Sequence, residues 1–151
     1  MKGKNYRKGV GIIIVNTKGL FFLGKRIGAE AWQFPQGGID EDEVPEEALY
    51  RELHEETGLV KGKVKILAVS KKWLVYHIPH LFQRSNKKYD GAMQKWFLLE
   101  LTGTNQDINL NAVSHAEFDA WKWADKSTAI NSVFRFKKLF MKVFFLNSRM
   151  S

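Results

Sequence analysis

The stretch at residues 45–58, PEEALYRELHEETG, constrains the fold more than any other because it carries helix signals at both ends. Pro45 suits the first helical turn, where an amide hydrogen would have no partner, and Gly58 suits the left-handed residue that follows many helices. Leu49 and Leu53 lie four residues apart and give the helix one apolar side. We therefore expect one helix with well-defined ends in the middle of the chain.

Strand patterns lie on both sides of this helix. Before it, the runs VGIIIV and LFFLGKRI are joined at Asn16–Gly19, which predicts a hairpin. The segment 32–40 contains Pro35 and two glycines and is expected to be irregular. After the helix, strands are expected at 63–78, 95–103 and 117–124, and a closing helix at 134–146. This order predicts a layered α/β fold, and the absence of repeats and linkers predicts a single domain over residues 1–151.

Charge is segregated along the chain. Residues 40–56 hold nine of the sixteen acidic residues and one base, whereas the net charge of the whole chain is +8. An acidic patch on a basic body indicates divalent cations at the patch and a polyanion around it. The alternative is a solvated acidic helix on a basic surface that binds nonspecifically.

Three glutamates share one side of the expected helix. Glu55 and Glu56 fall about 60° and 40° to either side of Glu52, at about 100° per residue. Like charges at this spacing destabilise an isolated helix. The pattern therefore needs an explanation outside helix formation.

The wider pattern supplies that explanation. From Gly37 the chain reads GGIDEDEVPEEALYRELHEETGL, and residues 37–59 match every defined position of the 23-residue Nudix box. The chain thus resembles the Nudix hydrolases, which cleave a nucleoside diphosphate linked to another moiety. The resemblance implies an α/β/α sandwich with a mixed β-sheet.

The resemblance also implies metal ligands. It assigns Glu52, Glu55 and Glu56, with the carbonyl of Gly37, to two or three Mg²⁺ ions, for which Mn²⁺ can substitute. Such hard cations prefer oxygen ligands, bridge to substrate phosphates and lower the pKa of a bound water. Glu117, in EFDAW, matches a distal glutamate that approaches the metals and acts as a base; the alternative is an ordinary strand-edge acid.

A structural pair is implied as well. Glu43 and Arg51 would form an ion pair that holds the loop of the box on its helix. Asp42 departs from the bacterial RNA pyrophosphohydrolase branch of these hydrolases, which the chain resembles and which often has glycine at this position, and so puts the shape of that loop in doubt.

The flanking segments YRKGVGIII, WQFPQGGI, MQKWFLLEL and AEFDAWKW resemble the bacterial RNA pyrophosphohydrolase and dinucleoside polyphosphate hydrolase branch. The branch implies substrate contacts at Arg7, Arg26, Tyr76, Lys95, Phe136 and Lys137. Arg7 would contact phosphate, and Arg26 with the Phe136–Lys137 pair would hold an RNA base by stacking. For Phe136 a place in the apolar side of the last helix is an equal alternative.

Two further departures concern the substrate. Ala92 and Met93 replace polar residues typical of the branch, although Lys95 is kept. We expect Mg²⁺-dependent removal of phosphate or pyrophosphate from the 5′ end of RNA, which leaves a 5′ monophosphate and promotes mRNA decay. A dinucleoside polyphosphate hydrolase and a non-catalytic RNA-binding module are the alternatives. No segment has the 18 or more apolar residues of a membrane span, so we expect a cytoplasmic protein without a membrane partner.

Overall fold

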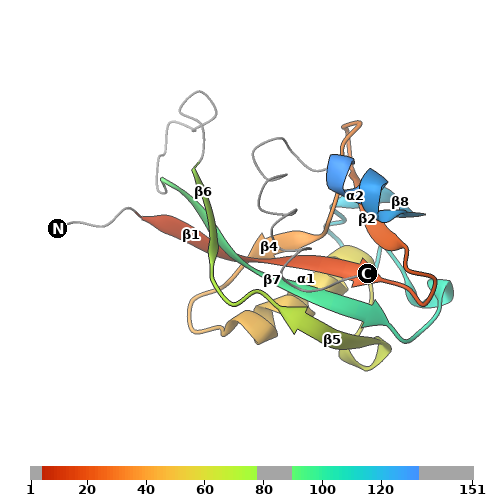
Figure 1. Cartoon of the computed structure of the whole chain (residues 1–151), viewed down its shortest axis with the longest axis horizontal. Coiled ribbons are helices and arrows are strands. Elements are labelled where there is room, and N and C mark those ends of the chain that lie inside the picture. The colour runs from red at the N-terminus through yellow and green to blue at the C-terminus, as the bar shows by residue number, and fades with distance from the viewer. Residues whose placement is uncertain (1–4, 78–89, 133–151) are drawn as a thin grey trace.

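A computed structural model of the chain describes residues 5–77 and 90–132 (Figure 1). Its strands are β1 (Tyr6–Val15), β2 (Phe21–Arg26), β3 (Trp32–Gln33), β4 (Gln36–Gly38), β5 (Val64–Val69), β6 (Leu74–His77), β7 (Gly91–Leu101) and β8 (Phe118–Ala124). Its helices are α1 (Pro45–Thr57) and α2 (Lys126–Ser132), and short 3₁₀ turns occur at η1 (Lys61–Lys63) and η3 (Asn105–Asp107).

The strands form one mixed sheet around β1. β1 pairs in parallel with β7 along its whole length, and every other pairing is antiparallel. The opposite edge of β1 is shared, because β2 pairs near Val15 whereas β4 pairs at Gly9, Val10 and Gly11. Val10, Ile12, Ile13 and Ile14 of the first apolar run are fully buried because β1 is covered on both faces, and Val15 at its end is half-buried.

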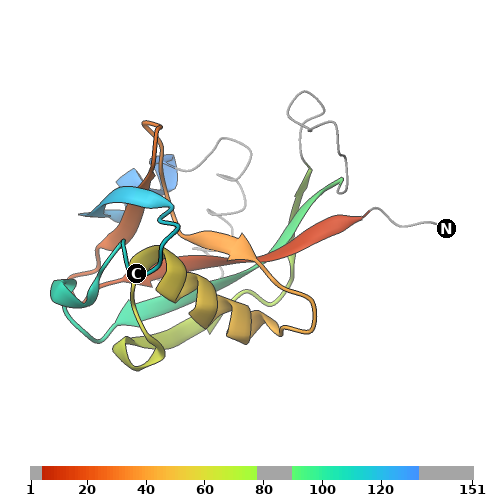
Figure 2. The same cartoon turned by 180° about the vertical axis from the view of Figure 1, so that it is seen from behind.

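Alternate residues of β1 face two different cores. Ile12 packs in one cluster with Leu49 and Leu53 of α1, whereas Ile13 packs in a second cluster with Ala129 of α2. The helices accordingly lie on opposite faces of the sheet, as a comparison of Figures 1 and 2 shows. This arrangement confirms the predicted α/β sandwich with a mixed sheet.

The predicted ends of the central helix are confirmed. Glu47 reaches back to accept a hydrogen bond from the amide of Val44, at 3.0 Å, just before the first turn. At the other end Gly58 has φ 78° and donates its amide to the carbonyl of His54 at 2.9 Å. Added to Gly58, a Cβ would lie 2.5 Å from the carbonyl oxygen of Asn109. Both the backbone conformation and the close neighbour therefore require glycine.

Several sequence expectations were wrong in detail. The segment 32–40 is not wholly irregular, because it contains β3 and β4. The expected strand at 63–78 is two strands, and Ser70 between them bonds to Trp96 through its amide and its hydroxyl. β7 begins four residues earlier than expected, and α2 was not predicted. The expected helix at 134–146 lies outside the described residues.

Among residues 5–77 and 90–132, no helix is long and apolar enough to cross a membrane.

Candidate active site

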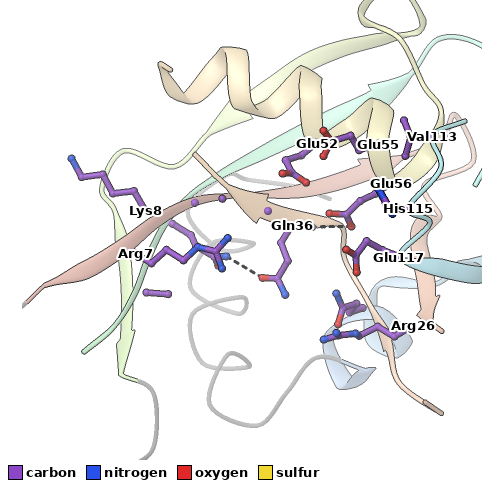
Figure 3. Close-up of a pocket in the computed structure, with 16 residues that line it drawn as sticks. Arg7, Lys8, Arg26, Gln36, Glu52, Glu55, Glu56, Val113, His115 and Glu117 are labelled. Carbon is purple, nitrogen blue, oxygen red and sulfur yellow. Dashed lines mark hydrogen bonds between the residues drawn. The ribbon is translucent and has the colours of Figure 1, made fainter. Parts of the chain in front are cut away.

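A cleft of about 560 Å³ crosses the sheet beside β4 (Figure 3). This volume is in the range of small-molecule sites. Acidic and basic side chains from distant parts of the chain line it together: Glu52, Glu55, Glu56 and Glu117, and Arg7, Lys8, Arg26 and His115. In Figure 3 the carboxylates of Glu56 and Glu117 point toward one another, and Arg7 and Arg26 approach from separate sides.

The close approach of α1 to β4 brings the helical glutamates into this cleft. The carboxylate of Glu52 lies where a Cβ on Gly37 would be placed, so no other residue fits at position 37 without moving the acid. A Cβ on Gly38 would lie 2.7 Å from Nη2 of Arg7. The two glycines thus let an acid and a base pack against the same short strand.

Two of the helical carboxyl groups are buried. Glu56 is 4% exposed and Glu52 is 9% exposed. The pKa of Glu56 is raised to about 9, chiefly by burial and then by the neighbouring Glu52, while the amide of Gln36 at 3.4 Å opposes the shift. Burial also raises the pKa of Glu52, although Arg51 opposes this. The cleft therefore needs a positive charge before both groups ionise.

A divalent cation fits that need. Within residues 5–77 and 90–132 no three acidic or histidine side chains are gathered as a ready-made metal cage. Mg²⁺ usually takes only one or two carboxylates and fills its other positions with water and substrate phosphates. Two adjacent buried carboxyl groups that repel one another suit this mode of binding. Gly37, the further ligand that the resemblance implies, also lines the cleft.

Arg51 ties the loop after β4 to the helix. Its Nε donates to Oε2 of Glu43 and its Nη2 to Oε1, both at 2.8 Å, and Nη2 also donates to the carbonyl of Gly38 at 2.7 Å. This guanidinium lowers the pKa of Glu43 to about 2. Nη1 donates to Glu52 at 2.8 Å, so the same group also orients a carboxylate of the cleft.

The loop explains the departure at Asp42. This residue has φ 70°, a left-handed conformation that glycine adopts freely and that aspartate adopts more readily than most residues. The loop accommodates aspartate in this conformation at some conformational cost.

Glu117 reaches the cleft through strand pairing. Its carbonyl accepts the amide of Ile27 at 3.1 Å, and the following residue, Phe118, pairs with Arg26 across β2 and β8. The pairing places the distal glutamate and a predicted base-binding arginine at the same end of the cleft.

The remaining predicted substrate contacts have different outcomes. Arg7 lines the cleft, and Tyr76 lies in β6 opposite Ala92, which also lines it. Lys95 does not line the cleft; its ammonium donates to the carbonyl of Ser70 at 3.2 Å. Its side chain leaves β7 on the face opposite to that of Gln94, because side chains alternate along a strand. Phe136 and Lys137 lie outside the described residues.

Five polar side chains of the cleft were missed by sequence reasoning: Gln33, Gln36, Gln94, His115 and Lys8. The first two stand inside the WQFPQGG segment, where the glutamines were a visible signal. Gln94 precedes Lys95, and only the orientation of β7 in the sheet shows which of the two side chains enters the cleft. Nothing in the sequence singled out His115.

Comparison with known proteins agrees with the fold. A family model for the NUDIX domain matches residues 5–142. The chain belongs to the Nudix family. Nudix hydrolases act on the phosphoanhydride bonds of nucleoside polyphosphates and generally use divalent metal ions such as Mg²⁺.

Solved structures of Nudix proteins share the fold. A C. elegans Ap4A hydrolase is 23% identical, with 93% of this chain and 98% of that chain covered and a TM-score of 0.66. The E. coli dihydroneopterin triphosphate pyrophosphohydrolase is 22% identical, with 95% and 99% covered and a TM-score of 0.74. The NUDIX domain of Shewanella oneidensis NrtR, complexed with ADP ribose, is 16% identical, with 99% and 91% covered and a TM-score of 0.59. At these identities the likeness shows the fold alone.

Proposed function

We propose that this Nudix protein hydrolyses a phosphoanhydride at the 5′ triphosphate or diphosphate end of RNA, with Mg²⁺, and leaves a 5′ monophosphate that promotes mRNA decay. The observation that carries the proposal is the cleft itself, in which four carboxylates face Arg7 and Arg26. Carboxylates suit the metal, whereas guanidinium groups suit the phosphates that the metal does not cover.

The residues take separate roles in this proposal. Glu52, Glu55 and Glu56 hold the metal, with Gly37 beside them, and Glu117 acts from the opposite wall as a base. When bound, the metal neutralises polyphosphate charge and lowers the pKa of a water. Arg51 positions Glu52, at 2.8 Å, and is not itself a catalytic residue.

The basic character of the rest of the chain favours a long polyanion as substrate. Outside residues 40–56 the chain carries 23 basic and seven acidic residues, and phosphate contacts along an RNA add affinity. Arg7, Arg26, Tyr76, Phe136 and Lys137 are the proposed RNA contacts. Lys95 is left out of this set because its ammonium is bonded elsewhere.

The test is a product assay with Mg²⁺ on two substrates. One is a short RNA with a labelled γ-phosphate on its 5′ triphosphate, and the other is diadenosine tetraphosphate. The proposal expects label to leave the RNA faster than the dinucleotide is cleaved. Turnover of the dinucleotide alone would show a dinucleoside polyphosphate hydrolase instead, and turnover of neither would favour a binding module.

Two variants make the assay specific to the cleft. Glu52→Gln is expected to lose activity by at least about 100-fold, because it removes a metal ligand. Glu46→Gln makes the same change in an exposed residue on the first turn of α1 and is expected to keep wild-type activity. Equal activity in both variants would refute the metal assignment.

A further inference from the structure

Three glutamines from three strands lie in the cleft beside the carboxylates: Gln33 of β3, Gln36 of β4 and Gln94 of β7. Gln94 is 6% exposed, and its Nε2 donates to Oε1 of Gln36 at 3.0 Å. The backbone amide of Gln36 in turn donates to Glu56 at 3.4 Å. Gln36 and Gln94 of this glutamine cluster are therefore tied to the acidic part of the site by hydrogen bonds, and Gln33 lines the same cleft.

Two oxygens of the glutamine cluster lack a partner. Oε1 of Gln33 and Oε1 of Gln94 are buried, and neither accepts a hydrogen bond within the part of the chain that the structure describes. Buried amide oxygens without a donor are uncommon and costly. In the orientation that the two amides adopt, Nε2 of Gln94 donates to Gln36 and Oε1 of Gln94 is left without a bond to any described residue. Within the described residues, both oxygens are therefore available to accept a hydrogen bond from a bound ligand.

The chemistry of a nucleotide limits what that donor is. Ionised phosphate oxygens only accept hydrogen bonds, so they pair with Arg7 and Arg26 and not with amide oxygens. Ribose hydroxyls and base N–H groups are the donors that a nucleoside polyphosphate carries. The unpaired oxygens thus match the nucleoside part of the substrate.

We propose that Gln33 and Gln94 form a nucleoside subsite, in which their Oε1 atoms accept hydrogen bonds from O–H or N–H groups of the nucleoside next to the scissile phosphates. The subsite rests on the proposed function for its substrate. It makes the two glutamines specificity-determining residues, because a site with buried acceptors rejects an analogue that lacks the donor.

The experiment compares three RNAs with a 5′ triphosphate, whose first nucleotide is guanosine, 2′-deoxyguanosine or inosine. The last two remove the 2′-hydroxyl or the 2-amino group. Wild-type protein is expected to prefer guanosine over at least one analogue by about tenfold in kcat/KM, the scale of one hydrogen bond. The analogue that loses turnover distinguishes a sugar donor from a base donor.

Variants assign the preference to the glutamines. Gln33→Met and Gln94→Met keep the length of the side chain without its amide, and at least one of them is expected to bring the ratio to about one. Gln33→Glu keeps acceptor oxygens and is expected to keep the preference. Gln106→Met is the matched control, because Gln106 is exposed in η3 and does not line the cleft.

The inference is overturned if wild-type protein treats the three RNAs alike, or if both methionine variants keep its preference. Equilibrium binding of guanosine triphosphate, its 2′-deoxy form and inosine triphosphate gives the same ratios without turnover. If the protein does not turn over RNA but still prefers guanosine triphosphate in binding, the proposed function is overturned and the subsite stands. If the protein turns over RNA without any preference among the three first nucleotides, the subsite is overturned and the proposed function stands.

Discussion

The buried Glu56 leads to a prediction about stability that does not depend on the substrate. In metal-free protein the pKa of this carboxyl is raised from 4.5 to about 9, chiefly by burial. Between these values the folded chain keeps a proton that the unfolded chain releases. The free energy of unfolding must therefore fall as the pH rises, by about 1.4 kcal/mol for each pH unit.

From pH 5.5 to pH 7.5 this slope amounts to a loss of at most about 3 kcal/mol, a large part of the stability of an ordinary domain. Glu56→Gln keeps the shape of the side chain and cannot ionise, so its stability should change much less over the same interval. Glu55→Gln is the control, because the Glu55 side chain is 41% exposed on the same helix. That variant should follow the wild-type slope.

The assay is urea unfolding with EDTA at the two pH values, followed by the fluorescence of the five tryptophans. Adding Mg²⁺ at pH 7.5 should stabilise the wild-type protein, since an ion that binds only the folded chain shifts the equilibrium. It should stabilise Glu56→Gln much less. Parallel pH dependence in the wild-type protein and Glu56→Gln would refute the reasoning, because burial of this carboxyl would then have no energetic consequence.

Three further predictions concern single substitutions. Gly37→Ala should lower activity by about 100-fold, because the added Cβ must displace the carboxylate of Glu52; turnover of labelled RNA measures the loss. Arg51→Lys should lower the free energy of unfolding in urea at pH 7 by about 1–3 kcal/mol. Arg51 lowers the pKa of Glu43 in the wild-type protein, so the stability of the variant should fall less than that of the wild-type protein as the pH drops from 4.5 toward 2. Gly58→Ala should cost about 1–2 kcal/mol or more, whereas Gly62→Ala, with no atom within 4 Å of its Cβ, should cost far less in the same assay.

The extent of α1 was determined by the sequence alone. Its start and its end depend on Pro45, Glu47 and Gly58, which act on backbone groups only a few residues away. The common side of Glu52, Glu55 and Glu56 follows from helical periodicity in the same way. Local interactions of this kind can be recognised from a short segment of the sequence.

Only the tertiary structure decided which side chains meet the three glutamates. β3 and β4 are two and three residues long, too short to show a period, and they form because β2 and β1 supply partners. The entry of Gln94 into the cleft, with Lys95 on the other face, depends on how β7 pairs with β1. Likewise the raised pKa of Glu56 arises from burial under distant segments. Proximity between remote residues is a property of packing, and no local pattern in the chain encodes it.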